Sequence, residues 1–163
     1  MANRPPTPWK FDPTRTPPGI SGPSVDYRLA RKASLGSLRN GSLDTGDVCD
    51  AHPELMRAGK NIGEETDSPC PICSHDSLRL VRYVYGEQLR HNNGRVVYPT
   101  EWFDELVERY DHFTCYVVEV CVDCAWNHLV RAFSAGRDFG KTNGGKPQAA
   151  PPRPSRSRPT RRA

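Results

Sequence analysis

The stretch from Ser68 to Leu80 reads SPCPICSHDSLRL, and two residues separate its cysteines, Cys70 and Cys73. A second pair with the same spacing, Cys121 and Cys124, begins after a further 47 residues. Two intervening residues let both sulfurs of a pair turn toward one point, and two such knuckles supply the four thiolates of a tetrahedral zinc site. The duplicated spacing therefore predicts one structural Zn²⁺ per chain, bound by these four cysteines.

Two other chemistries also use paired cysteines. A redox C-x-x-C pair usually opens a helix in an α/β frame, where the helix dipole lowers the pKa of the thiol. Here a strand is expected after each pair, which argues against that interpretation. An iron–sulfur cluster takes four cysteines as well, and it stays open as the minor alternative to zinc.

Four further side chains are weaker candidates. Cys49 and His52 form a C-x2-H pair that could add a ligand or belong to a second site. An isolated cysteine, however, is more often a small core residue. His75 and His128 follow the two knuckles closely, and either could donate a hydrogen bond to a ligand sulfur or simply face solvent.

The residues around the knuckles predict a small sheet. Residues 76–87 and 112–120 alternate or are rich in β-branched and aromatic side chains, as in strands. A third strand is expected over residues 125–134 from its context after the second knuckle. Residues 100–111 predict an amphipathic helix capped by Thr100. Residues 63–136 are therefore expected to form a zinc-ribbon-like domain, a three-stranded antiparallel sheet with this helix inserted.

The preceding residues, 24–62, predict a helical segment. Ser24 is expected to cap a helix that starts at Val25. A second helix is expected around Ala51–Ala58, with Asp47 or Asp50 as its cap and Gly59 at its end. The predicted fold class is thus α+β, with N-terminal helices before the sheet.

Both ends of the chain differ from this body in composition. The sequence of 163 residues holds 16 Pro and 13 Gly, and they concentrate in residues 1–23 and 137–163. These segments have few large apolar side chains to offset the entropy lost on folding. Both are therefore predicted to be disordered tails.

The net charge of +4 is unevenly distributed. Residues 136–163 carry eight Lys or Arg against one Asp, whereas residues 25–135 carry 12 basic against 17 acidic residues. The Pro/Arg-rich tail could attract nucleic acid non-specifically, or could only keep the chain in solution. The acidic body argues against a folded surface that grips a phosphate backbone.

The sequence also suggests where the protein works. Its first residues lack the apolar core of a signal peptide, and no apolar run reaches the length of a membrane span. A cytoplasmic protein without membrane association is therefore expected. In that compartment thiols stay reduced, which favours metal binding over disulfides.

Several runs carry a family resemblance. Residues 25–136 resemble a family of small actinobacterial proteins classed as a domain of unknown function. The most specific matching runs are Val48–Ala51, the Cys70–Cys73 knuckle, Val84–Glu87 and Val118–Val130. The resemblance implies a zinc-ribbon-like body, and it brings no established activity with it.

These observations favour a non-enzymatic structural-zinc protein that serves as an adaptor or a regulatory accessory factor. An unidentified protein partner would meet its acidic body or an aromatic face, for which the candidates are Tyr83, Tyr85, Trp102 and Trp126. The alternative is a nucleic-acid-binding or transcription-associated regulator. In that hypothesis, the two N-terminal helices form a helix-turn-helix-like element and the basic tail adds affinity.

A zinc-dependent enzyme is the remaining alternative. The deaminase signature H-x-E followed by P-C-x-x-C occurs by letter, at His52–Glu54 and Pro69–Cys73. The expected polar loop between them does not match the helical context of that family. Four cysteines also close the coordination sphere, whereas catalytic zinc keeps one position open. The sequence therefore predicts no catalytic residues.

Overall fold

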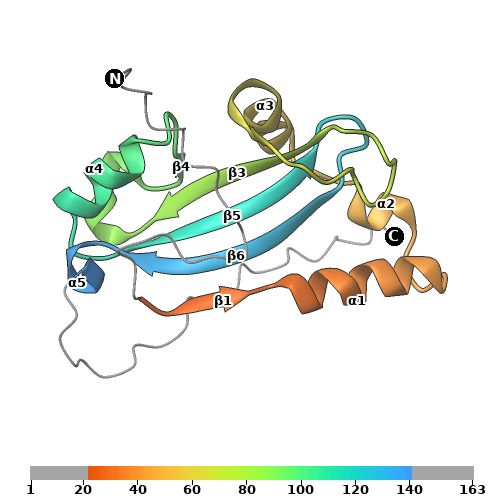
Figure 1. The fold of residues 1–163 in the computed structure, drawn as a ribbon, viewed down its shortest axis with the longest axis horizontal. Coiled ribbons are helices and arrows are strands. Elements are labelled where there is room, and N and C mark those ends of the chain that lie inside the picture. The colour runs from red at the N-terminus through yellow and green to blue at the C-terminus, as the bar shows by residue number, and fades with distance from the viewer. Residues whose placement is uncertain (1–21, 141–163) are drawn as a thin grey trace, which may run out of the picture.

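The computed structural model describes residues 22–140, and a six-stranded antiparallel sheet lies at its centre (Figure 1). Its three long strands are β3 (Leu78–Tyr85), β5 (Phe113–Cys121) and β6 (Asn127–Ala135). The order across the sheet is β1-β6-β5-β3-β2, and the short strand β4 also pairs with β3. The α+β class and the three long strands are confirmed.

The predicted count of three strands is wrong, because three short strands extend the sheet. They are β1 (Ser24–Asp26), β2 (Glu64–Glu65) and β4 (Arg95–Val96). Strands of two or three residues are too short for an alternating pattern to show in the sequence. β2 lies within residues 61–69, which the sequence presents as a polar loop.

The helix predicted from Val25 with Ser24 as its cap starts later in the structure. Val25 instead pairs with Ala132 of β6, where a β-branched side chain is favoured. Helix α1 (Arg28–Arg39) follows, and the Asp26 carboxylate accepts the backbone N–H of Arg28 at 2.8 Å. The ladder to β6 therefore outweighs the capping signal of the serine.

The next two helices are also shifted. A four-residue helix α2 (Thr45–Val48), which the sequence did not predict, has a capping box of Asp44 and Asp47. Helix α3 (Pro53–Ile62) is confirmed, but His52 rather than Asp47 or Asp50 caps it. The Nδ1 atom of His52 accepts the N–H of Glu54 at 3.2 Å. A histidine is an uncommon cap, so residue preference alone favoured the aspartates.

The inserted helix is confirmed as α4 (Trp102–Arg109), after the 3₁₀ helix η1 (Glu87–Asn92). Its predicted cap is wrong, since Glu101 immediately precedes the helix. The Thr100 hydroxyl instead accepts a hydrogen bond from the Arg82 guanidinium at 3.2 Å.

The two faces of the sheet are covered by different elements. In the β3–β5 register Val84 pairs with Cys115 and Leu80 with Glu119, so these residues share one face. Helix α4 covers one end of this face and completes the main core. The core comprises Leu80, Val84, Leu89, Val97, Phe103, Leu106, Phe113, Cys115, Val117, Val130, Phe133 and Ala135.

The opposite face is covered by α3, which lies over β3 and β5 in Figure 1. The close approach depends on Gly59, which is buried within the helix instead of ending it. A Cβ atom on Gly59 would lie 2.6 Å from Cγ1 of Val120, a distance that real side chains do not adopt. Gly36 in α1 has no neighbour within 4 Å of the same position.

The two glycines therefore predict opposite effects of the same substitution. Gly59→Ala is expected to lower the free energy of unfolding by about 1–3 kcal/mol, because it overpacks the α3–β5 contact. Gly36→Ala is expected to raise it by about 0.5–1 kcal/mol, since alanine costs less backbone entropy in a helix. Urea denaturation of both variants measures this. Equal effects would contradict the α3 packing described above.

The C-terminal boundary of the fold lies beyond the predicted one. Residues 137–140, expected in the disordered tail, form α5 (Arg137–Gly140). The Arg137 guanidinium pairs with the Asp111 carboxylate at 2.7 Å, which anchors this turn. Residues 1–21 and 141–163, where the rest of both predicted tails lies, are outside the described residues. None of the helices within residues 22–140 has the length and hydrophobicity to span a bilayer.

Candidate metal centre

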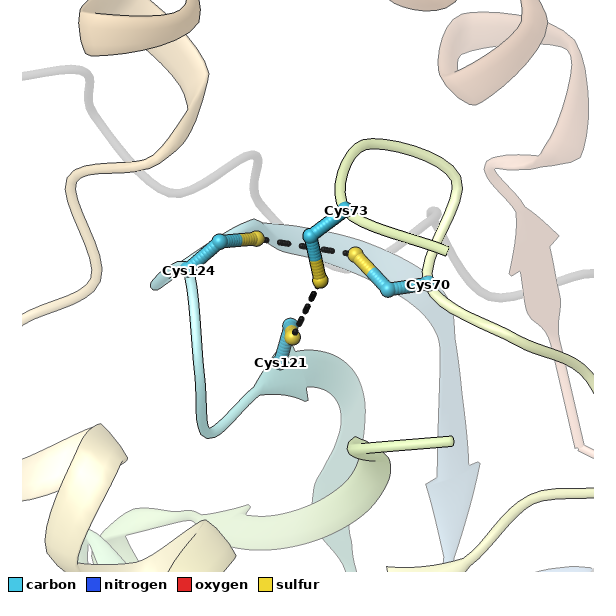
Figure 2. Close-up of side chains that lie close together, drawn as sticks. All are labelled: Cys70, Cys73, Cys121 and Cys124. Carbon is cyan, nitrogen blue, oxygen red and sulfur yellow. Dashed lines mark hydrogen bonds between the residues drawn. The ribbon is translucent and has the colours of Figure 1, made fainter. Parts of the chain in front are cut away.

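The four cysteines of the two knuckles meet at one point (Figure 2). Their Sγ atoms all lie within 4.8 Å of one another. The Sγ atoms of Cys70 and Cys124 are 3.6 Å apart, and those of Cys73 and Cys121 are also 3.6 Å apart. Four sulfurs arranged tetrahedrally at 2.3 Å from a zinc ion lie about 3.8 Å from each other. The cluster therefore has the spacing that a metal ion of this kind requires.

Backbone hydrogen bonds shape the first knuckle. The Cys70 carbonyl accepts the N–H of Ser74 at 3.0 Å, and the Cys70 N–H donates to the His75 carbonyl at 2.9 Å. Ser74 has a φ of 64°, in the left-handed region. This turn reverses the chain immediately after Cys73, so that both sulfurs face the same side.

The second knuckle repeats each of these features. The Cys121 carbonyl accepts the N–H of Ala125 at 3.0 Å, and the Cys121 N–H donates to the Trp126 carbonyl at 2.8 Å. Ala125 also has a φ of 64°. A left-handed residue other than glycine costs about 1–2 kcal/mol, yet both turns adopt it. Two segments 51 residues apart therefore share one backbone conformation that presents two sulfurs.

The surroundings of Cys70, Cys73 and Cys124 shift the pKa values of their thiols in both directions. Burial raises the pKa of the Cys70 and Cys124 thiols, because a thiolate loses solvation there. The backbone N–H of His75 lowers the pKa of Cys73, because it donates a hydrogen bond to the sulfur. Thiolates packed this closely repel one another, and a bound cation removes that repulsion. The donor set thus fits a divalent metal ion.

His75 also links the two knuckles through its side chain. Its Nδ1 lies 3.0 Å from Oδ2 of Asp123, an intervening residue of the second pair. The hydrogen bond to Asp123 raises the pKa of His75. Hydrogen bonds from the Ser77 hydroxyl and then from His75 lower the pKa of Asp123. The His75 ring therefore binds the Asp123 carboxylate at the exposed edge of the cluster, while the His75 backbone N–H donates to the Cys73 sulfur.

A buried polar triad lies beneath the second knuckle. The Trp126 side chain is fully buried, and its Nε1–H donates to Oε1 of Glu119 at 2.9 Å. The Arg31 guanidinium of α1 donates to the same oxygen. The His128 ring stacks on Trp126, and its Nδ1 lies 2.7 Å from the Leu129 carbonyl oxygen. His128 is thus placed by Trp126, and its predicted bond to a sulfur stays a prediction.

A fifth cysteine lies against the cluster. The Sγ of Cys49 is 3.9 Å from the Sγ of Cys124. The connector between α2 and α3, residues 49–52, docks on the second knuckle: the N–H of Ala51 donates to the Ala125 carbonyl at 3.1 Å. The Asn127 amide donates to the Asp50 carboxylate at 3.0 Å. The sequence marked Cys49 as a weak candidate, but it did not show this docking.

The other weak candidate, His52, lies elsewhere. Its side chain is exposed and is engaged in the cap of α3. The structure therefore gives His52 a local structural role and does not bring it into the four-sulfur group.

Cys115, on β5, is fully buried in the main core. Burial raises its pKa to about 12, so the thiol stays protonated at pH 8. We expect iodoacetamide to leave Cys115 unmodified in the native, zinc-loaded chain, in the absence of chelator and denaturant. Peptide mapping by mass spectrometry checks this. Modification of Cys115 before denaturant is added would contradict the described core.

Comparison with known proteins finds one matching family and similar mycobacterial proteins. It matches DUF5318, described as a family of unknown function, over residues 21–149. It is 39% identical over 115 residues to "Uncharacterized protein Rv0049" of Mycobacterium tuberculosis strain H37Rv, covering 69% of this chain and 81% of the relative. "Uncharacterized protein Mb0050" of Mycobacterium bovis matches to the same extent. No solved structure matches the chain significantly. The predicted actinobacterial resemblance is confirmed.

Proposed function

Since the chain belongs to DUF5318, a family of unknown function, we propose its role from its own geometry. It is a non-enzymatic protein that folds around one structural Zn²⁺ in a zinc-ribbon-like site. It acts as an adaptor or regulatory accessory factor for a protein partner. The observation that carries this proposal is the convergence of four cysteine sulfurs from two knuckles of matching backbone geometry.

Thiolate ligands in a tetrahedral arrangement favour zinc or iron–sulfur chemistry over hard cations. Four protein ligands leave a tetrahedral ion without an open position for water or substrate. This supports a structural role for the metal instead of a catalytic one. An iron–sulfur cluster is the minor alternative, and it would give the protein visible absorbance.

The site joins segments of the chain that are far apart in the sequence. It joins the loop before β3 to the turn between β5 and β6, so that one ion ties together the ends of all three long strands (Figure 2). A second buried cluster surrounds it, in which Leu35 of α1 and Val48 of α2 pack against Trp126 and the cysteines. The described body has 119 residues, and the free energy of metal binding would add to the stability that its core supplies.

The surface that supports a protein partner is aromatic. Tyr85 of β3 is 46% exposed, and its ring contacts the half-buried Tyr116 edge to face at 5.5 Å between centroids. Tyr83 lies on the same face of β3 and is half-buried. Tyrosine is enriched in protein interfaces, where it contributes large contact area. Trp126, expected in this face, is instead buried beneath the second knuckle.

The nucleic-acid alternative has less support from the arrangement of the helices. Helix α1 lies beside β6, whereas α3 lies over β3 and β5 on the far side of the sheet (Figure 1). A helix-turn-helix element requires two helices packed on each other. The body between Val25 and Ala135 also carries more acidic than basic residues.

A binding comparison tests the proposal. Zinc-loaded chain is immobilised and exposed to nuclease-treated actinobacterial lysate, beside the variants Tyr85→Ala and Glu108→Ala. We expect the wild type to retain a partner protein and Tyr85→Ala to lose it, because Tyr85 supplies exposed aromatic contact area. Glu108→Ala is expected to retain the partner, because Glu108 is exposed on α4 and not on β3. Removal of zinc with a chelator is expected to abolish this retention together with the tertiary structure.

Two results would overturn the proposal. One is binding of nucleic acid that depends on residues 141–163 and weakens steeply with salt, with no protein retained. The other is a chelated chain that keeps its fold and its partner, since the metal would then have no structural role.

A further inference from the structure

The cluster contains one sulfur more than a tetrahedral metal site uses. Cys49 lies 3.9 Å from Cys124, nearly the 3.6 Å that separates the ligand pairs. It does not belong to the group in which all sulfurs lie within 4.8 Å of one another. Cys49 is therefore in contact with one candidate ligand, Cys124, and is not part of the four-sulfur group itself.

The position of Cys49 is maintained by bonds that do not involve its sulfur. Its N–H donates to the Thr45 carbonyl at 2.8 Å, at the end of α2. The next two residues are fixed to the second knuckle, Asp50 through Asn127 and Ala51 through Ala125. Hydrogen bonds of the connector thus hold the Cys49 side chain against Cys124 without any bond to the Cys49 sulfur.

The two thiols also lie on the accessible side of the cluster. Cys49 and Cys124 are half-buried, whereas Cys70 and Cys121 are buried. A small oxidant that reaches the site from solvent can therefore meet Cys124 with Cys49 already beside it. Cys73 is half-buried as well, but the fifth thiol lies next to Cys124.

We propose that Cys49 and Cys124 form a disulfide when a hydroperoxide oxidises the cluster, and that this bond releases the metal. The proposal rests on the zinc site proposed above. In the first step the Cys124 thiolate attacks hydrogen peroxide, giving a sulfenic acid and hydroxide. In the second step the Cys49 thiol attacks that sulfur, forming the disulfide and releasing water. Two sulfurs are oxidised by two electrons in total, and one peroxide is reduced.

Formation of the bond requires only a local movement. The 3.9 Å separation must close to the ~2.05 Å of a disulfide. Once bonded to Cys49, Cys124 no longer has a thiolate to offer, and three ligands remain for the metal. The consequence is a site that opens under oxidation and that a dithiol reductant with Zn²⁺ restores.

The test uses full-length, zinc-loaded chain treated with hydrogen peroxide. A chromogenic chelator follows zinc release, and mass spectrometry of tryptic peptides maps disulfides at each time point. The variants are Cys49→Ser and Asp50→Ala, with Cys115→Ala as a matched control from the main core. Asp50→Ala keeps all thiols and removes only one bond that positions the connector.

We expect the wild type and Cys115→Ala to release zinc together with a Cys49–Cys124 disulfide. Cys49→Ser is expected to release zinc at least about fivefold more slowly, because no neighbouring thiol traps the sulfenic acid. Asp50→Ala is expected to fall between them. Dithiothreitol with added Zn²⁺ is expected to restore the wild type.

An early disulfide between two ligand cysteines, with Cys49 still reduced, would overturn the proposal. Equal release rates in the wild type and Cys49→Ser would do the same. The two proposals can fail independently. A chain that contains no zinc before peroxide is added refutes the structural-zinc proposal, whereas the disulfide map tests the Cys49–Cys124 bond without any metal measurement.

Discussion

Replacement of Cys121 with Ser is expected to leave the chain without bound zinc and without a cooperative unfolding transition. Cys121 is fully buried, and its sulfur lies 3.6 Å from that of Cys73. Serine removes a thiolate ligand that three sulfurs cannot replace. Because metal binding and folding are one equilibrium in such sites, the loss corresponds to about 10 kcal/mol or more of metal-binding free energy. Near-ultraviolet circular dichroism and metal analysis of the purified variant measure it.

Cys115→Ala is the matched control for this experiment. Cys115 is as buried as Cys121 but lies in the main core. Its replacement removes one sulfur atom from a packed site, which is expected to cost about 1 kcal/mol and to leave zinc binding intact. A Cys121→Ser variant that retains zinc and unfolds like Cys115→Ala would contradict the shared four-cysteine site.

Replacement of Glu119 with Ala is expected to lower the free energy of unfolding by about 3–5 kcal/mol, although it lies outside the cysteine cluster. Glu119 is 6% exposed, and Oε1 accepts hydrogen bonds from both Trp126 and Arg31. Without the carboxylate, the half-buried Arg31 guanidinium loses its charge partner, and the buried Trp126 indole N–H loses its acceptor. Urea denaturation of the zinc-loaded protein measures the effect.

Two further variants separate charge from hydrogen bonding. Glu119→Gln keeps an oxygen acceptor for Trp126 and removes the charge that Arg31 faces, so it is expected to cost less than Glu119→Ala. Glu108→Ala, an exposed glutamate on α4, is expected to change stability by no more than about 0.5 kcal/mol. If Glu119→Ala resembles Glu108→Ala, the triad does not stabilise α1 against the sheet.

The long elements of the fold could be predicted because their patterns extend over many residues. β3 alternates along its length, β5 is rich in β-branched and aromatic residues, and α4 has a clear apolar stripe. β1 could not be predicted, because Ser24 and Val25 also read as the start of a helix. Only the ladder to β6, distant in sequence, decides between the two.

The sequence predicted the four ligand cysteines of the candidate site, but not the turns that follow them or the contact of Cys49. The C-x2-C spacing brings Cys70, Cys73, Cys121 and Cys124 together in the sequence and in the structure. The left-handed turn after each pair carries no glycine, the residue that usually marks such a turn. The contact of Cys49 with Cys124 depends on how the α2–α3 connector docks, which no local pattern encodes.

The central claim is that four cysteine thiolates hold one structural zinc ion. X-ray absorption at the zinc edge, on chain purified without added metal and quantified by elemental analysis, tests it most directly. The account predicts one zinc per chain with four sulfur ligands at about 2.3 Å. Absence of zinc, a first shell that includes nitrogen or oxygen, or iron with sulfide in its place would contradict it.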